Sequence, residues 1–335
     1  MSSSTDFAPE QAPAAPARAP RQRIQRRPVH GVLLLDKPLG LSSNDALQKA
    51  KWLLRAEKAG HTGTLDPLAT GLLPLCFGAG TKFSQVSLDA DKAYEAVLQL
   101  GVKTSTGDAE GEVLERRPVA VTREQIEAAC AAFTGEIDQV PPMHSALKHE
   151  GKALYDYARQ GITIERPARR VTIHRIDILD WQDGEIQQLR IAVRCTKGTY
   201  IRTLGEDIGE RLGCGAHLSA LRRTGSGPLR VEDAITLDAL AAMSEDERLA
   251  LLRPPDSLLQ DWPALRLDAD EAGRFLSGLR RRVAAADAGQ VRVYGPEPQA
   301  FLGSAHVKAG ELIADRLLSP QEVQSLLAGP GTRSG

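Results

Sequence analysis

Residues 60–71 place an aspartate and a histidine in a segment whose shape is set by its glycines and its proline. The sequence GHTGTLDPLATG holds three glycines and one proline, a composition that excludes a regular helix. Asp66 stands immediately before Pro67, and a residue before proline is restricted to extended backbone. An aspartate has an ordinary pKa of about 3.9 and is ionised at neutral pH, so Asp66 is the outstanding candidate for side-chain chemistry.

Both residues also have a purely structural interpretation. An Asp-Pro pair more often forms a turn than a catalytic site. A lone histidine in a loop more often faces solvent or makes a local hydrogen bond. The context favours chemistry here, because His61 lies close before Asp66 and the glycines allow a second backbone to approach.

The rest of the chain carries no familiar cofactor or metal motif. It has no GxGxxG stretch, no GxxxxGK[ST] phosphate loop and no HExxH sequence. Its four cysteines contain no CxxC pair, so we expect neither a zinc site nor a disulfide framework. Free thiols are typical of a reducing cytoplasm, where we expect the protein to reside. We therefore expect side-chain chemistry that uses no metal and no cofactor.

The elements that would position this loop follow from the spacing of apolar residues. A short apolar run at 32–35 predicts a buried strand, and the alternation over 92–100 and 185–195 predicts half-buried strands. Helices are expected over 44–56 behind Ser42 or Ser43, after the capping box of Thr122 and Gln125, and at 200–212. Because alternating strands dominate, the predicted fold class is α+β, with a large mixed, mostly antiparallel sheet flanked by helices.

Composition divides the chain into segments. Residues 1–29 hold five prolines and five arginines, which predicts a disordered basic tail, either a solvated extension or an arm that contacts phosphates. The charged, turn-rich stretch 135–170 predicts a surface insertion. Prolines and acidic residues over 244–264 predict a boundary, after which strand-like runs near 291–294 and 300–303 predict a small β-rich domain over 255–330.

The net charge of −1 is, at first sight, an argument against a nucleic-acid partner, because such partners usually leave a basic footprint. The charge is nevertheless segregated along the chain. Residues 161–230 hold 12 basic and 8 acidic side chains, whereas residues 231–335 hold 11 basic and 16 acidic ones. A local basic excess can supply the electrostatics that the total hides.

The loop at 60–71 resembles the active-site motif of the TruB family of pseudouridine synthases. Further segments resemble family segments in the family's order: 31–38, 42–44, 91–94, 142–148, 197–202 and 221–223. The resemblance covers about residues 30–230 and is highly specific. The tail lies outside it, and the last hundred residues match weakly.

The resemblance implies an enzyme that isomerises uridine to pseudouridine at position 55, in the T-loop of tRNA. It makes Asp66 the catalytic nucleophile and Arg202 its supporting ion-pair partner. It also implies that four residues bind the flipped-out uridine: His61, Tyr94, Tyr200 and Leu221. Attack on the uracil ring and attack on the ribose both stay open.

Structural alternatives stand beside these roles. Tyr94 and Leu221 would be ordinary core residues, and Arg202 would form a surface ion pair worth about 0–1 kcal/mol. Arg222 and Arg223 are candidates for phosphate contacts, with solvated surface charge as the alternative. Lys37-Pro38 matches a family motif that we interpret as chiefly structural.

The family further implies a pseudouridine-synthase-like catalytic domain over 30–250, with an insertion at about 135–170 that grips RNA, and a PUA-like domain over 255–330. The expected partner is the T-arm of tRNA. We expect no membrane span, no obligatory protein partner and a monomer. Two other functions stay open: an RNA-binding module without catalysis, and a glycoside hydrolase, which would need a second acid matched to Asp66.

Overall fold

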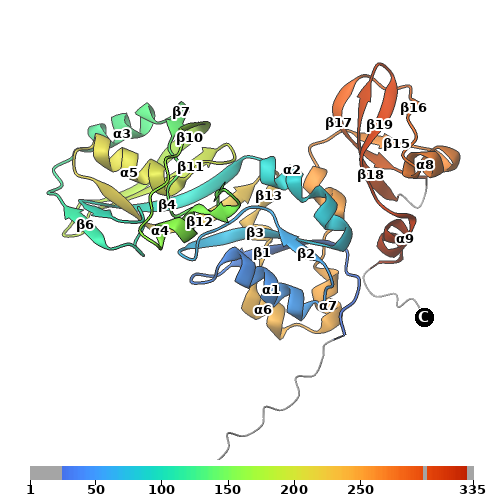
Figure 1. Ribbon diagram of the computed structural model, residues 1–335, viewed down its shortest axis with the longest axis horizontal. Coiled ribbons are helices and arrows are strands. Elements are labelled where there is room, and N and C mark those ends of the chain that lie inside the picture. Colours follow the sequence, from blue (N-terminus) through green and yellow to red (C-terminus); the bar gives the residue numbers. More distant parts are fainter. Residues whose placement is uncertain (1–24, 297–299, 330–335) are drawn as a thin grey trace, which may run out of the picture.

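The computed structural model describes residues 25–296 and 300–329. A large body is built on one long sheet, and a smaller body at the C-terminal end has a sheet of its own (Figure 1). Helices flank both sheets. This arrangement confirms the predicted fold class.

The long sheet consists of β1 (Gly31–Lys37), β2 (Ala59–His61), β3 (Ala69–Phe77), β4 (Lys92–Leu100), β7 (Gly135–Gln139), β10 (Arg169–Gln182), β11 (Gln188–Cys195), β12 (Ala216–Ser226), β13 (Leu229–Arg230) and β14 (Ile235–Thr236). Its strand order is β14-β1-β3-β12-β4-β11-β10-β7, with β2 paired to β3 and β13 to β12. The β1–β14 and β3–β12 pairs are parallel, and the others are antiparallel. The sheet is therefore mixed and mostly antiparallel, as predicted.

Two groups of helices cover this sheet, each over its own apolar core. α1 (Ser43–Leu53), α6 (Leu237–Ala242) and α7 (Glu245–Ala250) accompany the half that contains β1 and β3. α3 (Arg123–Ala132) and α5 (Ile201–Arg211) accompany the half that contains β4, β10 and β11, over a core that includes Leu98, Ile126, Ile191 and Leu204. The predicted capping box of Thr122 and Gln125 starts α3. Between these elements lie a 3-10 turn (Gly78–Phe83), α2 (Ser84–Asp89) and the hairpin of β5 (Val102–Thr104) and β6 (Val113–Arg116).

The C-terminal body is a five-stranded sheet in the order β15-β17-β18-β19-β16, with two helices beside it. Its elements are β15 (Ala264–Arg266), α8 (Ala269–Leu276), β16 (Arg281–Arg282), β17 (Ala288–Tyr294), β18 (Phe301–Lys308), β19 (Glu311–Leu317) and α9 (Pro320–Ala328). One apolar cluster joins this body to the large one, because Val32 and Phe83 belong to the same cluster as Phe275 and Phe301. The two bodies therefore share a core.

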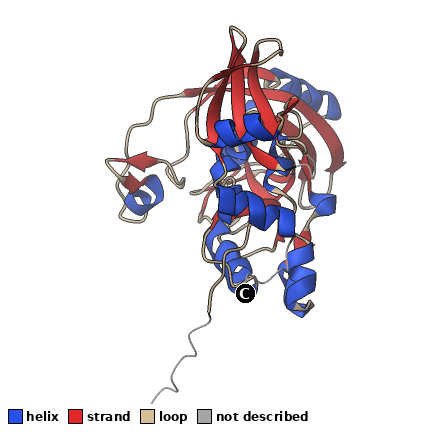
Figure 2. Ribbon diagram, turned by 90° about the vertical axis from the view of Figure 1, so that its right-hand side faces the viewer, coloured by secondary structure: helices blue, strands red, loops and turns tan. Residues whose placement is uncertain are grey.

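The insertion expected over 135–170 begins and ends inside regular strands of the long sheet. β7 and β10 pair with each other, so the segment that leaves the sheet is 140–168. We call 140–168 the excursion. It carries the hairpin of β8 (Lys148–His149) and β9 (Lys152–Ala153), followed by α4 (Leu154–Ala158), and it stands out from the large body (Figure 2).

The expected disordered tail lies mostly outside the described residues, which begin at 25. For residues 25–29 the expectation was wrong. The Arg27 backbone bonds to the Arg55 carbonyl at 2.9 Å and to the Glu57 amide at 3.1 Å, and its side chain pairs with Glu245 at 2.6 Å. Val29 is buried in the core. No helix among the described residues is long and apolar enough to cross a membrane.

Gly71 on β3 is required by the close approach of β12. Its φ is +98°, and a Cβ added there would overlap the backbone of Arg223, the residue paired with it on β12. We expect Gly71→Ala to lower the free energy of unfolding by about 2–4 kcal/mol, through strain and lost packing together. Gly40→Ala is the matched control, because Gly40 has a φ of +82° with nothing within 4 Å of its added Cβ. Equal losses in chemical denaturation would contradict the steric explanation.

Candidate active site

The segment between β2 and β3 is tied to α1 and to the turn that joins β1 to α1. Ser42 caps α1, which leaves the Ser43 hydroxyl free to accept from the Leu65 amide at 2.7 Å and donate to the Leu65 carbonyl at 3.1 Å. The Gly40 amide donates to the Pro67 carbonyl at 2.8 Å. These bonds fix the backbone on both sides of Asp66, so the position of its carboxylate is set by the loop.

The Asp66 carboxylate forms an ion pair with Arg202. Arg202 lies in the first turn of α5, and its Nη2 lies 3.0 Å from Asp66 Oδ2. The Arg202 side chain is only 6% exposed, whereas that of Asp66 is 41% exposed. The arrangement is a carboxylate that faces solvent while a buried guanidinium holds it from behind, which suits a nucleophile that must reach a substrate.

Arg202 has further partners that fix its orientation. Its Nη1 donates to the Thr106 carbonyl at 3.0 Å and its Nη2 to the His144 carbonyl at 2.6 Å, the latter in the excursion. Its Nε lies 3.6 Å from Oδ2 of Asp108, a side chain that is 5% exposed. Arg202 is therefore a buried cation between two carboxylates, not the surface ion pair of the alternative interpretation.

Tyr94 and Leu221 lie on neighbouring strands beside the loop. Tyr94 on β4 is opposite Arg223 on β12, and Leu221 on β12 is opposite Ala69, three residues after Asp66. Both side chains are partly buried and pack between the two cores of the large body. Burial raises the pKa of Tyr94, and the nearby Arg223 cation partly opposes that rise.

Tyr200 is the N-cap residue of α5, two positions before Arg202. Its backbone is held from both sides by the Gln139 side chain, which accepts from the Tyr200 amide at 3.0 Å and donates to its carbonyl at 3.2 Å. Burial raises the pKa of Tyr200 above its ordinary value of 10. The phenol is therefore neutral at physiological pH.

His61 ends β2 and is half-buried at the start of the loop. Burial is the largest influence on this imidazole and lowers its pKa below the ordinary value of 6.5. The ring is therefore neutral at pH 7. The six predicted site residues thus come from four parts of the fold. These are β2 with the loop after it (His61 and Asp66), the start of α5 (Tyr200 and Arg202), β4 (Tyr94) and β12 (Leu221).

Comparison with known proteins identifies the family. Residues 51–201 match the TruB family pseudouridylate synthase (N terminal domain), 202–260 the tRNA pseudouridylate synthase B C-terminal domain, and 263–318 the pseudouridine synthase II TruB C-terminal domain. The chain is 61% identical over 319 residues to a tRNA pseudouridine synthase B of Verminephrobacter eiseniae, covering 94% of this chain and 96% of that protein. The chain belongs to the TruB family.

A second relative and two solved structures agree with this assignment. A tRNA pseudouridine synthase B of Ralstonia nicotianae is 61% identical over 92% of this chain and 99% of its own. A chain in the crystal structure of a Cbf5–Nop10–Gar1 complex superposes with a TM-score of 0.67, at 26% identity, over 90% of this chain and 87% of its own. One in the structure of an H/ACA RNP bound to a substrate RNA has the same fold, with a TM-score of 0.65 at 24% identity over 89% and 87%. The resemblance seen in the sequence motifs is confirmed.

Sequence reasoning missed Asp108 in this TruB-family site. Asp108 lies in the loop of the β5–β6 hairpin, where it accepts from the Thr106 hydroxyl at 2.5 Å and the Glu110 amide at 3.1 Å. The stretch TSTGDAEG reads as an ordinary polar turn. The available signal was an aspartate in a loop between two short apolar runs, which does not separate a buried aspartate from an exposed one.

Lys37, read from the sequence as structural, is also buried next to the site. It is fully inaccessible to solvent, and its Nζ donates to the carbonyls of Leu41 at 2.6 Å and Pro38 at 2.9 Å. Burial lowers its pKa to about 8, against the opposing influence of the Asp66 carboxylate. These bonds stabilise the turn that follows β1.

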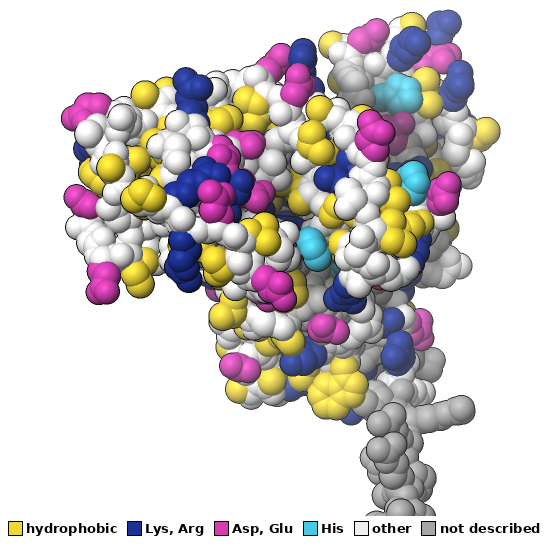
Figure 3. All heavy atoms as spheres, turned by 60° about the vertical axis from the view of Figure 1, so that its left-hand side comes forward, with side chains coloured by type: hydrophobic (Ala, Val, Ile, Leu, Met, Phe, Trp, Pro, Cys, Tyr) yellow, Lys and Arg dark blue, Asp and Glu magenta, His cyan; other side chains and the backbone are white. Residues whose placement is uncertain are grey.

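The sequence makes Arg222 and Arg223 candidates for phosphate contacts, and this prediction is wrong for Arg223. Arg223 is 1% exposed and cannot reach a phosphate. Arg222 is partly exposed but is held in a two-point ion pair by Asp36, at 2.9 and 2.7 Å. The space-filling view shows basic and acidic side chains mixed over one face of the large body (Figure 3). On this face the basic side chains do not form a continuous basic surface.

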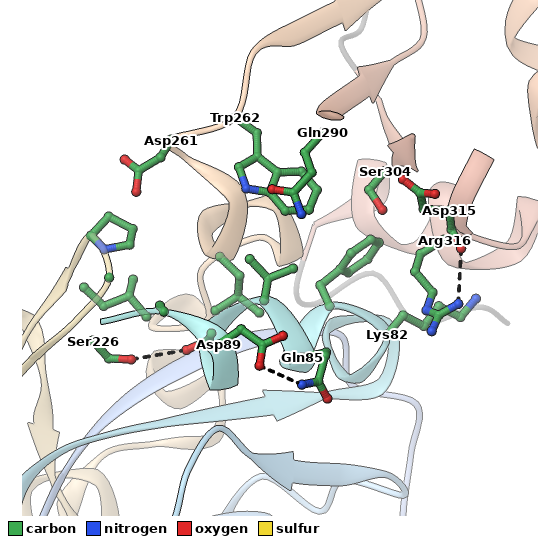
Figure 4. Close-up of a pocket in the computed structure, with 18 residues that line it drawn as sticks. Lys82, Gln85, Asp89, Ser226, Asp261, Trp262, Gln290, Ser304, Asp315 and Arg316 are labelled. Atoms are coloured by element: carbon green, nitrogen blue, oxygen red, sulfur yellow. Dashed lines mark hydrogen bonds between the residues drawn. The ribbon is translucent and has the colours of Figure 1, made fainter. Parts of the chain in front are cut away.

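A cleft of about 570 Å³ lies between the large body and the C-terminal sheet, away from Asp66 (Figure 4). Its walls carry Gln85 and Asp89 from α2, Trp262 and Gln290 from the C-terminal body, and Arg316 from β19. Asp89 accepts from Gln85 at 3.1 Å and from Lys197 at 2.8 Å. None of the six predicted site residues lines it.

Proposed function

We propose that this chain converts uridine to pseudouridine at position 55 in the T-loop of tRNA, with Asp66 as the nucleophile. The observation that carries the proposal is the 3.0 Å contact between the buried Arg202 and the exposed Asp66 carboxylate. Its relatives at 61% identity are named tRNA pseudouridine synthase B, which supports tRNA as the substrate.

The geometry suits attack by Asp66 on a nucleotide that enters from solvent. The Arg202 guanidinium holds one oxygen of the carboxylate by a charge-assisted hydrogen bond, which fixes its direction. The free oxygen is available to an electrophilic carbon of the substrate. Attack at uracil C6 or at ribose C1′ would both detach the base and let it turn.

The proposed roles of the other residues follow from where they lie. Tyr94 and Leu221 border the nucleophile on adjacent strands and offer apolar surface to a base removed from its stack. Tyr200 would line the pocket beside Arg202. His61, neutral at pH 7, would support the nucleotide conformation without adding charge. Extruding a base costs a few kcal/mol, so contacts that replace its stacking are required.

The excursion is the proposed RNA grip. Lys152 lies over the ring of Tyr157 at 4.8 Å, and the Arg159 guanidinium lies over the ring of Tyr155 at 5.4 Å. Lys148, Arg159 and Tyr155 are exposed. Cations paired with aromatic faces are suited to backbone phosphates and unstacked bases. The His144 carbonyl in the excursion accepts a hydrogen bond from Arg202. A change in the excursion on RNA binding would therefore alter the position of Arg202 and, through it, of Asp66.

Mapping of pseudouridine in a treated tRNA transcript tests the proposal. We expect one new pseudouridine at position 55 on incubation of the purified protein with an unmodified transcript, and none when that uridine is replaced by cytidine. Modification at another position would contradict the T-loop assignment. Release of free uracil without pseudouridine would favour a hydrolase, and binding without any product would favour an RNA-binding module.

A further inference from the structure

Three arginines near the site differ in what neutralises them. Arg202 lies between two carboxylates, and Arg222 pairs with Asp36. Arg223 is as deeply buried as Arg202, but among the described residues no carboxylate lies within ion-pairing distance of it. Burial of an unpaired cation is unfavourable, and such groups often have a functional reason.

The contacts of Arg223 lead to the catalytic loop and to Tyr94. Its Nε donates to the Leu72 carbonyl at 2.7 Å, and its Nη2 lies 3.5 Å from the Gly63 carbonyl of the loop. Tyr94 is its direct partner across the β4–β12 ladder, so the two side chains lie next to each other on one face of the sheet. The partner of this cation on the neighbouring strand is therefore an ionisable phenol.

The proposed reaction requires a proton acceptor. Uridine has hydrogen on C5 and carries the ribose on N1, whereas in pseudouridine C5 carries the ribose and N1 carries hydrogen. Once the C1′–C5 bond has formed, the electron pair of the C5–H bond must return to the ring. The proton must leave to a base, and N1 takes a proton from water.

We propose that Arg223 is a positioning residue for this proton transfer: it holds the Tyr94 hydroxyl and places a cation beside the phenolate oxygen that accepts the C5 proton. The inference rests on the proposed function. The phenolate becomes a neutral phenol on accepting the C5 proton and then gives that proton to the hydroxide left when water protonates N1. The phenolate is thereby regenerated, and the charge of Arg223 remains unchanged throughout. The same guanidinium fixes the loop at Gly63, so Tyr94 is aligned with the nucleophile.

The other groups around Tyr94 oppose its ionisation. Burial is the largest influence and raises its pKa. Asp66, from the loop, and Cys195, on β11, act in the same direction, although burial raises the pKa of Cys195 to about 11 and keeps this thiol neutral. Among the groups facing the phenol, Arg223 is the one that favours the phenolate. Its removal should therefore raise the pKa of Tyr94.

Fluorine NMR of protein labelled with 3-fluorotyrosine measures this directly, without substrate. The Tyr94 resonance is identified by its loss in Tyr94→Phe. We expect Arg223→Met to lower the ionisation constant of Tyr94 about tenfold or more, and Arg223→Lys, which keeps the charge, to lower it less. Arg222→Met is the matched control and should leave it unchanged. An unaltered Tyr94 titration in folded Arg223→Met would overturn the proposal. If Arg223→Met does not fold, a Tyr94 titration in Arg223→Lys identical to that of Arg222→Met would do so.

A mutant cycle on turnover separates this inference from the proposed function. We expect Arg223→Met to reduce kcat about 30-fold in the wild-type background but no more than about threefold in Tyr94→Phe, because coupled residues are non-additive. Equal losses in both backgrounds would overturn the link to Tyr94. Full turnover in Tyr94→Phe would instead refute the role of Tyr94 in the proposed function, whatever the NMR titration shows.

Discussion

Asp66→Asn is expected to abolish pseudouridine formation while tRNA binding remains. The amide has the shape of the carboxylate but cannot act as a nucleophile, so we expect kcat to fall by about 10⁴-fold or more, the scale of loss when an essential nucleophile is removed. Because Asp66 is 41% exposed, the substitution leaves no buried void, and the free energy of unfolding should change little. Single-turnover kinetics and filter binding on the same transcript measure both quantities.

Asp177→Asn is the matched control for this variant. Asp177 lies on β10 and pairs with Arg175 at 2.7 Å on the surface, away from the loop that carries Asp66. We expect its turnover to equal that of the wild type within experimental error. Retained turnover in Asp66→Asn would refute the nucleophile assignment. Loss of tRNA binding together with turnover would mean that the carboxylate positions RNA instead of reacting with it.

Arg202→Met is expected to have the second largest effect, on both activity and stability. The substitution leaves Asp66 without its buried partner, and we expect kcat to fall by about 10²–10³-fold, as when a preorganised charged contact is lost. It also leaves Asp108 buried at 5% exposure without a cation. Breaking a buried pair on one side costs about 3–5 kcal/mol. Turnover and denaturant unfolding of the same preparation test both effects.

The double variant Arg202→Met with Asp108→Asn separates the two effects. Neutralising Asp108 removes the unpaired buried charge, so we expect part of the lost stability to return. Turnover should remain as low as in Arg202→Met, because Asp66 still lacks its partner. Recovery of turnover together with stability would show that Arg202 supports the fold alone.

The parts of the fold that could be predicted are those with a local cause. β4 runs over 92–100, as the alternation indicated, and α3 starts at its capping box, because each pattern specifies its own burial or its own hydrogen bonds. The Asp66 loop was found for the same reason. The ends of this loop were not predicted, because β2 and β3 extend into 60–71. β3 is buried along nearly its whole length, so its sequence shows no alternation that would mark where the strand begins.

The missing parts of the site depend on long-range pairing. Arg222 and Arg223 are adjacent in sequence, yet one is partly exposed and the other fully buried. Which of them faces inward is decided by the register of β12 between β3 and β4, a register that shifts at Leu218/Ala220 and again at Arg223/Gly225. Asp108 is buried because Arg202 comes to it from α5. Neither fact has a signature within a short window of sequence.

The position of β12 in the sheet has a consequence for how the protein is made. β12 lies between β3 and β4, although it is synthesised long after both. Until it is inserted, β1–β3 and β4–β11–β10–β7 are separate half-sheets, each with an unpaired strand edge that could pair with another chain. Asp66 belongs to one half and Tyr94 to the other. The nascent chain therefore has no assembled site until residue 226 is available, and closure of loops this long makes β12 insertion an entropically costly late step.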